Sequence, residues 1–181
     1  IQKYPSSIVS ADILKVYSSS WNKDTVSMLY QQLTGEAKNS IYGKQVLDFL
    51  TYNKSPKIGD PFVDFQQATM DGKQVKLSDY KGKVVLLEFW GSWCSPCREG
   101  HPFLIKTYNE FKDKGFEILG VAADTDKKIL VSAIQNDGLP WQNVSDLKGD
   151  QNKAALIYGV SYYPANFLID KNGIIIAKDL R

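Results

Sequence analysis

The sequence has 181 residues, of which 43% are hydrophobic and 23% charged, with a net charge of +2. This composition is typical of a globular domain with an appendage. The small net charge gives no reason to expect nucleic acid or an anionic membrane as a partner. No apolar run approaches the ~18 residues of a membrane-spanning helix, so we expect membrane anchoring only through a segment absent from this sequence. Two cysteines are too few for a disulfide-stapled scaffold.

Apolar residues in the first 55 positions repeat at helical spacing, which predicts three short amphipathic helices. The expected buried stripes are Val9, Ile13, Val16 and Tyr17; Val26, Leu29, Tyr30 and Leu33; and Tyr42, Val46, Phe49 and Leu50. Asn22 and Asp24 are suited to cap the second helix, and Gly35 is suited to end it. We interpret residues 1–55 as a structural helical segment, because no residue in it indicates a binding role.

A break at residues 55–61, "SPKIGDP", separates this segment from a second domain, predicted over residues 56–181. A hairpin is expected over 62–77, with Asp71 and Gly72 in its turn. The apolar runs at 84–91 and 116–124 predict strands buried on both faces, as in a parallel sheet.

Helices are expected near 127–137 and 152–158, the latter capped by Asp150, and strands at 165–170 and 173–180. Strands that alternate with helices and end in a hairpin predict an α/β fold with a mixed central sheet flanked by helices.

The only two cysteines, Cys94 and Cys97, stand between the first buried strand and a predicted helix. Unpaired first-turn amides and the helix dipole stabilise a thiolate there, and such cysteines have pKa values of about 3.5–7.5. We therefore expect Cys94 to be an exposed nucleophile. Cys97, one turn later and deeper, would attack the mixed disulfide that Cys94 forms. Pro96 suits the first helical turn.

Two other interpretations of the pair are weaker. A zinc site needs about four nitrogen or sulfur ligands, and the chain offers two cysteines and His101. A purely structural disulfide across so short a loop would constrain the unfolded chain little. A redox dithiol that needs neither metal nor cofactor is therefore favoured.

The stretch "EFWGSWCSPCR" resembles the active site of thioredoxin-fold proteins. The lead-in "IGDPFVDFQQATMDGKQVKLSDYKGKVVLLEFW" resembles that of the redoxin superfamily, which comprises peroxiredoxins and extracytoplasmic thiol–disulfide oxidoreductases of the TlpA/ResA type. "VSYYPANFLIDKNG" resembles its cis-proline segment, and Pro102 resembles the proline that kinks the active-site helix. The resemblance covers about residues 57–181 and implies a thioredoxin-like fold. A helical segment ahead of it is similar to the multidomain arrangement of Bacteroidetes homologues.

The resemblance implies a role for each matching residue. Cys94 corresponds to the nucleophile, Cys97 to the resolving thiol and Trp93 to the tryptophan that flanks the nucleophile. Pro164 corresponds to the cis-proline that faces the dithiol and, with the backbone of Tyr163, pairs with an extended substrate.

Glu88 stands in the middle of an apolar strand, where a carboxylate is costly unless it is partnered or protonated. Burial would raise its pKa, as a proton shuttle for Cys97 requires. It also resembles the buried acid of thioredoxin, six residues before the nucleophile. The alternative is an edge-exposed or salt-bridged carboxylate, with Lys83 or Lys76 as its partner.

The chain departs from the TlpA/ResA pattern in two places. The glutamate usually found three residues after the second cysteine is replaced by Gly100, and Glu99 lies one residue early, about 100° around the helix. Glu88 would then carry the acid–base role alone. The sequence also ends at Arg181, where the family usually adds a helix, so we expect that helix to be missing or replaced by another cover, such as the N-terminal helices.

The residues favour a reductase over three alternatives. Peroxiredoxins use a P-x-x-x-T/S-x-x-C pattern, which is absent before Cys94. A disulfide-forming oxidase needs an over-stabilised thiolate, but no histidine lies between the cysteines and Arg98 is expected to point to solvent. A non-catalytic client-binding module has no need of two cysteines. We therefore expect a thiol:disulfide oxidoreductase of the bacterial cell envelope, on the periplasmic side, with disulfide-bonded client proteins and an upstream thiol electron donor as partners.

Overall fold

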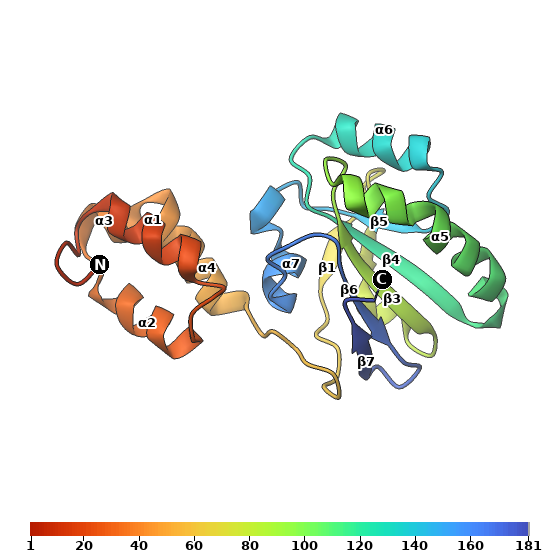
Figure 1. Ribbon diagram of the computed structural model, residues 1–181, viewed down its shortest axis with the longest axis horizontal. Coiled ribbons are helices and arrows are strands. Elements are labelled where there is room, and N and C mark those ends of the chain that lie inside the picture. Colours follow the sequence, from red (N-terminus) through yellow and green to blue (C-terminus); the bar gives the residue numbers. More distant parts are fainter. Residues whose placement is uncertain (181) are drawn as a thin grey trace. The chain divides into compact units, whose positions relative to one another are not determined.

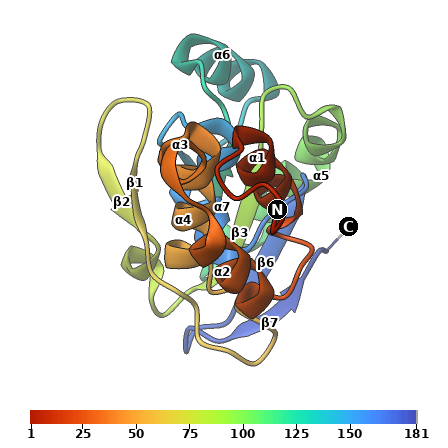
Figure 2. The same cartoon turned by 90° about the vertical axis from the view of Figure 1, so that its left-hand side faces the viewer.

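The computed structural model describes residues 1–180, and the chain divides into two compact units. The first is Ile1–Lys54 and the second begins at Ser55. The units are drawn from red to orange and from yellow to blue (Figures 1 and 2). No helix within residues 1–180 combines the length and the apolar character needed to cross a membrane.

The first unit contains four helices rather than the predicted three. They are α1 (Ile8–Tyr17), α2 (Lys23–Gln32), α3 (Gly35–Asn39) and α4 (Ile41–Tyr52). The Asn22 side chain accepts a hydrogen bond from the Asp24 amide at 2.8 Å, which confirms Asn22 as the cap of α2. The prediction that Gly35 ends α2 is wrong, because α2 stops at Gln32 and Gly35 begins α3.

The stripe predicted for the first helix is also wrong. α1 buries Ser10, Ala11 and Leu14. The predicted stripe is 40–64% exposed instead: Val9, Ile13, Val16 and Tyr17. The small Ser10 and Ala11 let α1 lie close against α3 and α4 around the fully buried Leu14, so close packing as well as hydrophobicity selects its buried face. The other two stripes are confirmed, since their members are buried or pack against the buried core of this unit.

The second unit is built on a five-stranded sheet in the order β5-β4-β3-β6-β7. Its strands are β3 (Val84–Trp90), β4 (Phe116–Ala122), β5 (Gln142–Val144), β6 (Ala165–Ile169) and β7 (Ile175–Lys178). β3 pairs in parallel with β4 and antiparallel with β6, so the sheet is mixed, as predicted. β1 (Gln66–Ala68) and β2 (Gln74–Lys76) form the predicted hairpin.

Helices cover both faces of this sheet. α5 (Ser95–Phe111) and α6 (Lys127–Asp137) lie side by side in Figure 1. Their residues share a buried cluster with Leu86 and Trp90 of β3. α7 (Lys153–Tyr158) packs on the opposite face, where the Tyr158 ring contacts Phe89 and Phe167. The alternation of a strand explains this division, because successive side chains of β3 point to opposite faces.

Two details of this unit differ from the sequence prediction. The edge strand β5 was missed, because it has three residues and no apolar run. α7 is capped by the Asn152 side chain, which accepts from the amides of Ala154 and Ala155, and not by Asp150. An asparagine and an aspartate two residues apart offer the same kind of cap, so composition alone could not choose between them.

Candidate active site

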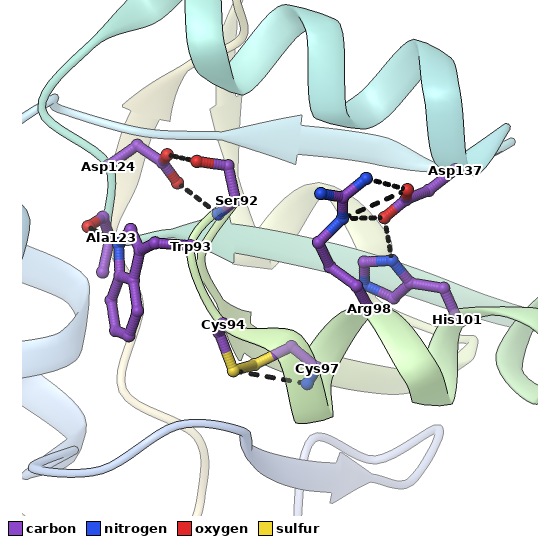
Figure 3. The surroundings of a disulfide bond; sticks show 9 residues. All are labelled: Ser92, Trp93, Cys94, Cys97, Arg98, His101, Ala123, Asp124 and Asp137. Carbon is purple, nitrogen blue, oxygen red and sulfur yellow. Dashed lines mark hydrogen bonds and ion pairs between the residues drawn. A yellow bond between two sulfur atoms is a disulfide. The ribbon is translucent and has the colours of Figure 1, made fainter.

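The two cysteines lie where β3 gives way to α5. Cys94 is the N-cap of α5 and forms a disulfide with Cys97 one turn later (Figure 3). The amide of Cys97 donates to the Cys94 sulfur at 3.3 Å. The same first-turn amide would stabilise a Cys94 thiolate after reduction. Pro96 lies in the first turn, as predicted.

In the disulfide form Cys94 is not exposed, contrary to the sequence prediction. Its exposed fraction is 4%, against 2% for Cys97, and both belong to the buried cluster below α5 and α6. The half-buried Tyr163 packs against this cluster. The sequence correctly predicted where the cysteine pair lies in the fold, but it did not predict that the surrounding side chains bury Cys94.

The loop before Cys94 is fixed by contacts to the end of β4. The Asp124 carboxylate accepts hydrogen bonds from the amide and the hydroxyl of Ser92. The Trp93 indole nitrogen donates to the carbonyl of Ala123 at 3.2 Å, although its side chain is 58% exposed overall. Sequence reasoning missed Asp124. Its position at the carboxyl end of a strand beside β3 was the available signal.

The cis-proline segment faces this loop. The Tyr163–Pro164 peptide bond is cis. The Tyr163 ring contacts Trp93 edge to face, with 5.4 Å between the ring centroids. A side chain at Gly91 would displace the indole, because its Cβ would lie 2.7 Å from the Trp93 ring. Two aromatic side chains therefore border the approach to the disulfide.

Glu88 is 3% exposed within β3. It alternates with Leu86 and Trp90, so its side chain faces the cluster that contains Cys94 and Cys97. Burial raises the pKa of Glu88 to about 8, partly offset by a hydrogen bond from Asn166, the residue opposite it on β6. Its Oε2 has no hydrogen-bond partner within residues 1–180.

The salt-bridge alternative for Glu88 is not realised through Lys83, whose ammonium lies 2.7 Å from Glu117 instead. Lys76 is exposed and belongs to the separate hairpin. Since no ion pair reaches Glu88 within residues 1–180, burial sets its protonation.

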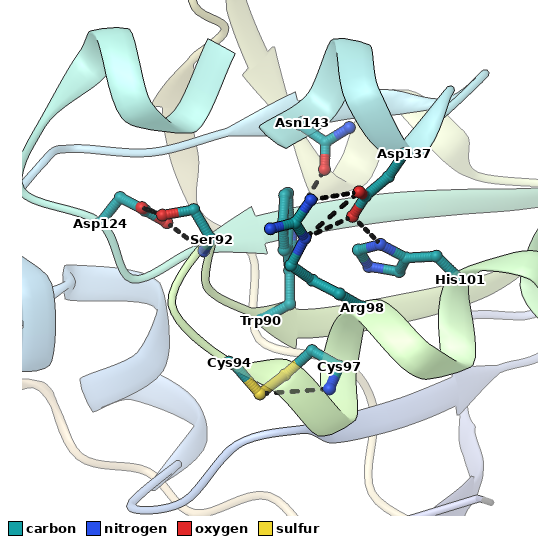
Figure 4. Close-up of polar contacts among 9 residues, drawn as sticks. All are labelled: Trp90, Ser92, Cys94, Cys97, Arg98, His101, Asp124, Asp137 and Asn143. Carbon is teal, nitrogen blue, oxygen red and sulfur yellow. Dashed lines mark hydrogen bonds and ion pairs between the residues drawn. A yellow bond between two sulfur atoms is a disulfide. The ribbon is translucent and has the colours of Figure 1, made fainter. Parts of the chain in front are cut away.

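A three-residue polar network connects α5 to the end of α6 (Figure 4). Arg98 donates to both carboxylate oxygens of Asp137, with Nη2–Oδ1 at 2.6 Å and Nε–Oδ2 at 2.9 Å. The Oδ2 atom of Asp137, which accepts from Arg98 Nε, also lies 2.8 Å from Nδ1 of His101. The expectation that Arg98 points to solvent is therefore wrong. These bonds lower the pKa of Asp137, chiefly through Arg98.

The network was not found from sequence, since Asp137 is 39 residues from Arg98 along the chain. His101 had been considered only as a zinc ligand. Within residues 1–180 no group of three or more His, Cys, Asp or Glu side chains is arranged to hold a metal ion. Glu99, which lies one residue before the position of the family's glutamate, is exposed. At Gly100, which occupies that position, an added Cβ would meet no atom within 4 Å.

Comparison with known proteins places this geometry in a family. Residues 58–178 match the AhpC/TSA family. The thiol-disulfide oxidoreductase ResA of Bacillus thuringiensis is 34% identical over 128 residues, which cover 71% of this chain and 72% of that protein. ResA of Geobacillus kaustophilus is 36% identical over 126 residues, covering 70% and 71%.

Solved structures agree with these relatives. The thioredoxin domain of a thiol-disulfide oxidoreductase from Bacteroides vulgatus has a TM-score of 0.66 and 39% identity, covering 70% of this chain and 91% of that one. A thiol-disulfide oxidoreductase from Bacteroides fragilis has a TM-score of 0.64 and 30% identity, covering 67% and 91%. With its cysteine pair at the start of α5, the chain belongs to the AhpC/TSA family and is a thioredoxin-fold thiol-disulfide oxidoreductase of the TlpA/ResA type.

Proposed function

We propose that this thiol-disulfide oxidoreductase works as a reductase of disulfides in client proteins. The observation that carries the direction is the neutralised charge beside the dithiol. Arg98, the cation that directly follows Cys97, is bound by Asp137. An oxidase needs its reduced thiolate strongly stabilised, and a paired arginine supplies little net positive charge for that purpose.

The cycle transfers two electrons to the client. The Cys94 thiolate attacks a client disulfide, which forms a mixed disulfide and releases one client thiol. Cys97 then loses its proton and attacks the Cys94 sulfur, which forms the Cys94–Cys97 disulfide and releases the second client thiol. An upstream thiol donor reduces this disulfide, and its own thiols become oxidised. The disulfide in the structure corresponds to the oxidised enzyme.

Glu88 is proposed to accept the proton of Cys97. Its side chain faces the cluster that holds both cysteines, and its pKa of about 8 lies near physiological pH. General bases work best when their pKa is close to the operating pH. Glu99, which is exposed, takes no part in this proposal.

Trp93, Tyr163 and Pro164 are proposed to bind the client. The exposed indole and the edge of Tyr163 form an aromatic border next to the disulfide. The backbone of Tyr163 is proposed to pair with an extended client segment, as an added strand pairs with a sheet edge. Residues 1–54 are proposed to be a structural helical unit without a role in the chemistry.

The periplasmic side of a bacterial cell envelope is the proposed location, because client disulfides persist in oxidising compartments. Fusion of the full-length protein to a reporter enzyme that is active only outside the cytoplasm tests this. An active fusion is expected, whereas a fusion active only inside the cytoplasm would contradict the location.

The reduction potential of the Cys94–Cys97 pair tests the direction of electron flow. Equilibration against a glutathione or dithiothreitol series should give a value near about −270 mV or lower. A value near about −120 mV would identify an oxidase instead.

A trapping experiment tests the order of attack. Cys97→Ser protein should accumulate a covalent complex with a client through Cys94, because the mixed disulfide can no longer be resolved. Cys94→Ser protein is the matched control and should trap none. Trapping by the control alone would reverse the two roles.

A further inference from the structure

His101 is a buried ionisable side chain that the mechanism above leaves unused. It is 1% exposed and lies on α5 one helical turn after Cys97. Its ring contacts Trp90 edge to face, with 4.9 Å between the ring centroids. One ring nitrogen, Nδ1, faces Asp137, and the other, Nε2, has no hydrogen-bond partner within residues 1–180.

The partners of the ring determine where its proton lies. Asp137 is held ionised by Arg98, which lowers the pKa of that carboxyl. A carboxylate only accepts hydrogen bonds, so Nδ1 of His101 must be the donor. Burial lowers the pKa of His101, although Asp137 partly opposes this. The ring is therefore neutral at pH 7, with its proton on Nδ1 and a free lone pair on Nε2.

The ring lies on the helix that carries Cys97, one turn further along, and its Nε2 makes no hydrogen bond with a sulfur atom in the disulfide form. Residues four apart on a helix share one face, about 5–6 Å apart at Cβ. Helical side chains also lean toward the preceding turn. Figure 3 shows the imidazole leaning from its backbone toward the turn that carries Cys97 and Arg98. Trp90, on which the ring rests, belongs to the same buried cluster as both cysteines.

We propose that His101 is a second buried proton acceptor of the dithiol, oriented by Asp137 and Arg98. This inference rests on the proposed function, because it concerns the step in which Cys97 resolves the mixed disulfide. There the Cys97 sulfur loses its proton and bonds to the Cys94 sulfur, while the client sulfur leaves with the electron pair of the broken bond. The proton moves to Nε2, and the resulting imidazolium is stabilised by Asp137. The proton later passes from Nε2 to the released client thiolate or to water.

The charged and titratable groups near the ring determine the pH range in which His101 is needed as a proton acceptor. Arg98 on α5 and Asp137 on α6 act on the ring directly, and Glu88 lies two residues before Trp90 on β3, the strand on which the ring packs. With a pKa of about 8, Glu88 is mostly protonated at pH 7, so only its ionised fraction can accept the Cys97 proton there. His101 would add a second acceptor in that pH range, so its contribution should fade above about pH 8.

Kinetics of the full chain with Ellman's disulfide reagent test the proposal. With one equivalent, the first coloured thiolate released reports attack by Cys94 and the second reports resolution by Cys97. His101→Gln, which keeps a donor for Asp137 but takes up no proton, should slow the second phase at least about tenfold at pH 7. The first phase should stay unchanged, and the slowdown should shrink above pH 8. His101→Phe preserves the packing on Trp90 and should behave alike.

Gly100→Ala is the matched control on the same helix, since its Cβ meets no neighbour, and both phases should keep their rates. An unchanged second phase in His101→Gln would overturn the role of His101. If Glu88→Gln still slows that phase, the proposed function stands without it. Failure of the wild-type protein to show a second phase would instead count against the proposed function itself.

Nitrogen NMR of the labelled wild-type protein gives a readout independent of turnover. The neutral ring with its proton on Nδ1 is the expected form at pH 7. A proton on Nε2, or a charged imidazolium, would overturn the proposal whatever the kinetics show.

Discussion

Glu88 on β3 and His101 on α5 are both buried in the second unit, but their surroundings differ. The Asn166 side chain lowers the pKa of Glu88 by hydrogen bonding, and within residues 1–180 Glu88 forms no ion pair. His101 lies against a carboxylate that is itself bound by Arg98. Burial pushes both groups toward their neutral forms, raising the pKa of Glu88 and lowering that of His101. For His101, the Asp137 carboxylate opposes the fall in pKa and fixes the proton on Nδ1.

The comparison predicts that Glu88 and Asp137, the partner of His101, make the stability of the fold depend on pH in opposite directions. Glu88 has a folded-state pKa raised from 4.5 to about 8, so between these values the folded protein holds a proton that the unfolded chain releases. Its burial therefore destabilises the fold progressively as pH rises from 4.5 to 8. Asp137 has a lowered pKa, so its stabilisation is present above 3.8 and is lost as pH falls through the folded-state value.

The largest expected effect on stability is that of Glu88→Gln in alkaline solution. Glutamine imitates the protonated acid but cannot ionise, so the penalty for burying a carboxylate disappears. We expect the disulfide form of the variant to gain about 3–5 kcal/mol over wild type at pH 9. Little difference is expected at pH 4.5. Urea denaturation at both pH values measures it, and parallel pH curves would show that Glu88 is not buried as a neutral acid.

Asp137→Asn should have the next largest effect, in the opposite direction. It replaces the charged acceptor of Arg98 and His101 with a neutral amide that keeps one accepting oxygen, and hydrogen bonds to charged groups contribute about 1.5–3 kcal/mol. We expect a loss of about 2–3 kcal/mol of unfolding free energy at pH 7, which should shrink as the pH approaches 3. Arg98→Ala should reproduce part of the loss. A uniform loss at every pH would indicate that packing, and not charge, accounts for the contribution of Asp137.

The difference between the two sites also explains which one the sequence could predict. Glu88 was found because a charged residue interrupts an apolar strand, and that signal is local. The network around His101 joins residues 36 and 39 positions apart, and no local pattern marks Asp137 as its centre. Strands, helices and the cysteine pair depend on neighbours in the sequence, whereas this network depends on how α5 and α6 pack.

The two units also differ in how well the sequence predicted which residues are buried. In the second unit the runs around Leu87 and Leu119 were long and apolar, so their burial followed directly from the pattern. In the first unit α1 has apolar residues on more than one face, and the buried face is the one with small side chains, Ser10 and Ala11. Helical periodicity predicted the helix but chose the wrong face, because close packing as well as hydrophobicity selects the buried face.

The smallest expected effect is that of Lys83→Met, which tests whether an exposed ion pair behaves like the buried network. The Lys83 side chain is 47% exposed and that of its partner Glu117 is 20% exposed. Exposed pairs contribute about 0–1 kcal/mol, because water screens both charges and ordering long side chains costs entropy. We expect a loss of under about 1 kcal/mol, reduced by added salt. Because Lys83 does not contact Glu88, the pH dependence attributed to Glu88 should remain. If Lys83→Met changed that dependence, the Lys83 ammonium would influence the pKa of Glu88. The contrast between Glu88, which forms no ion pair within residues 1–180, and His101, which lies against a carboxylate, would then no longer hold.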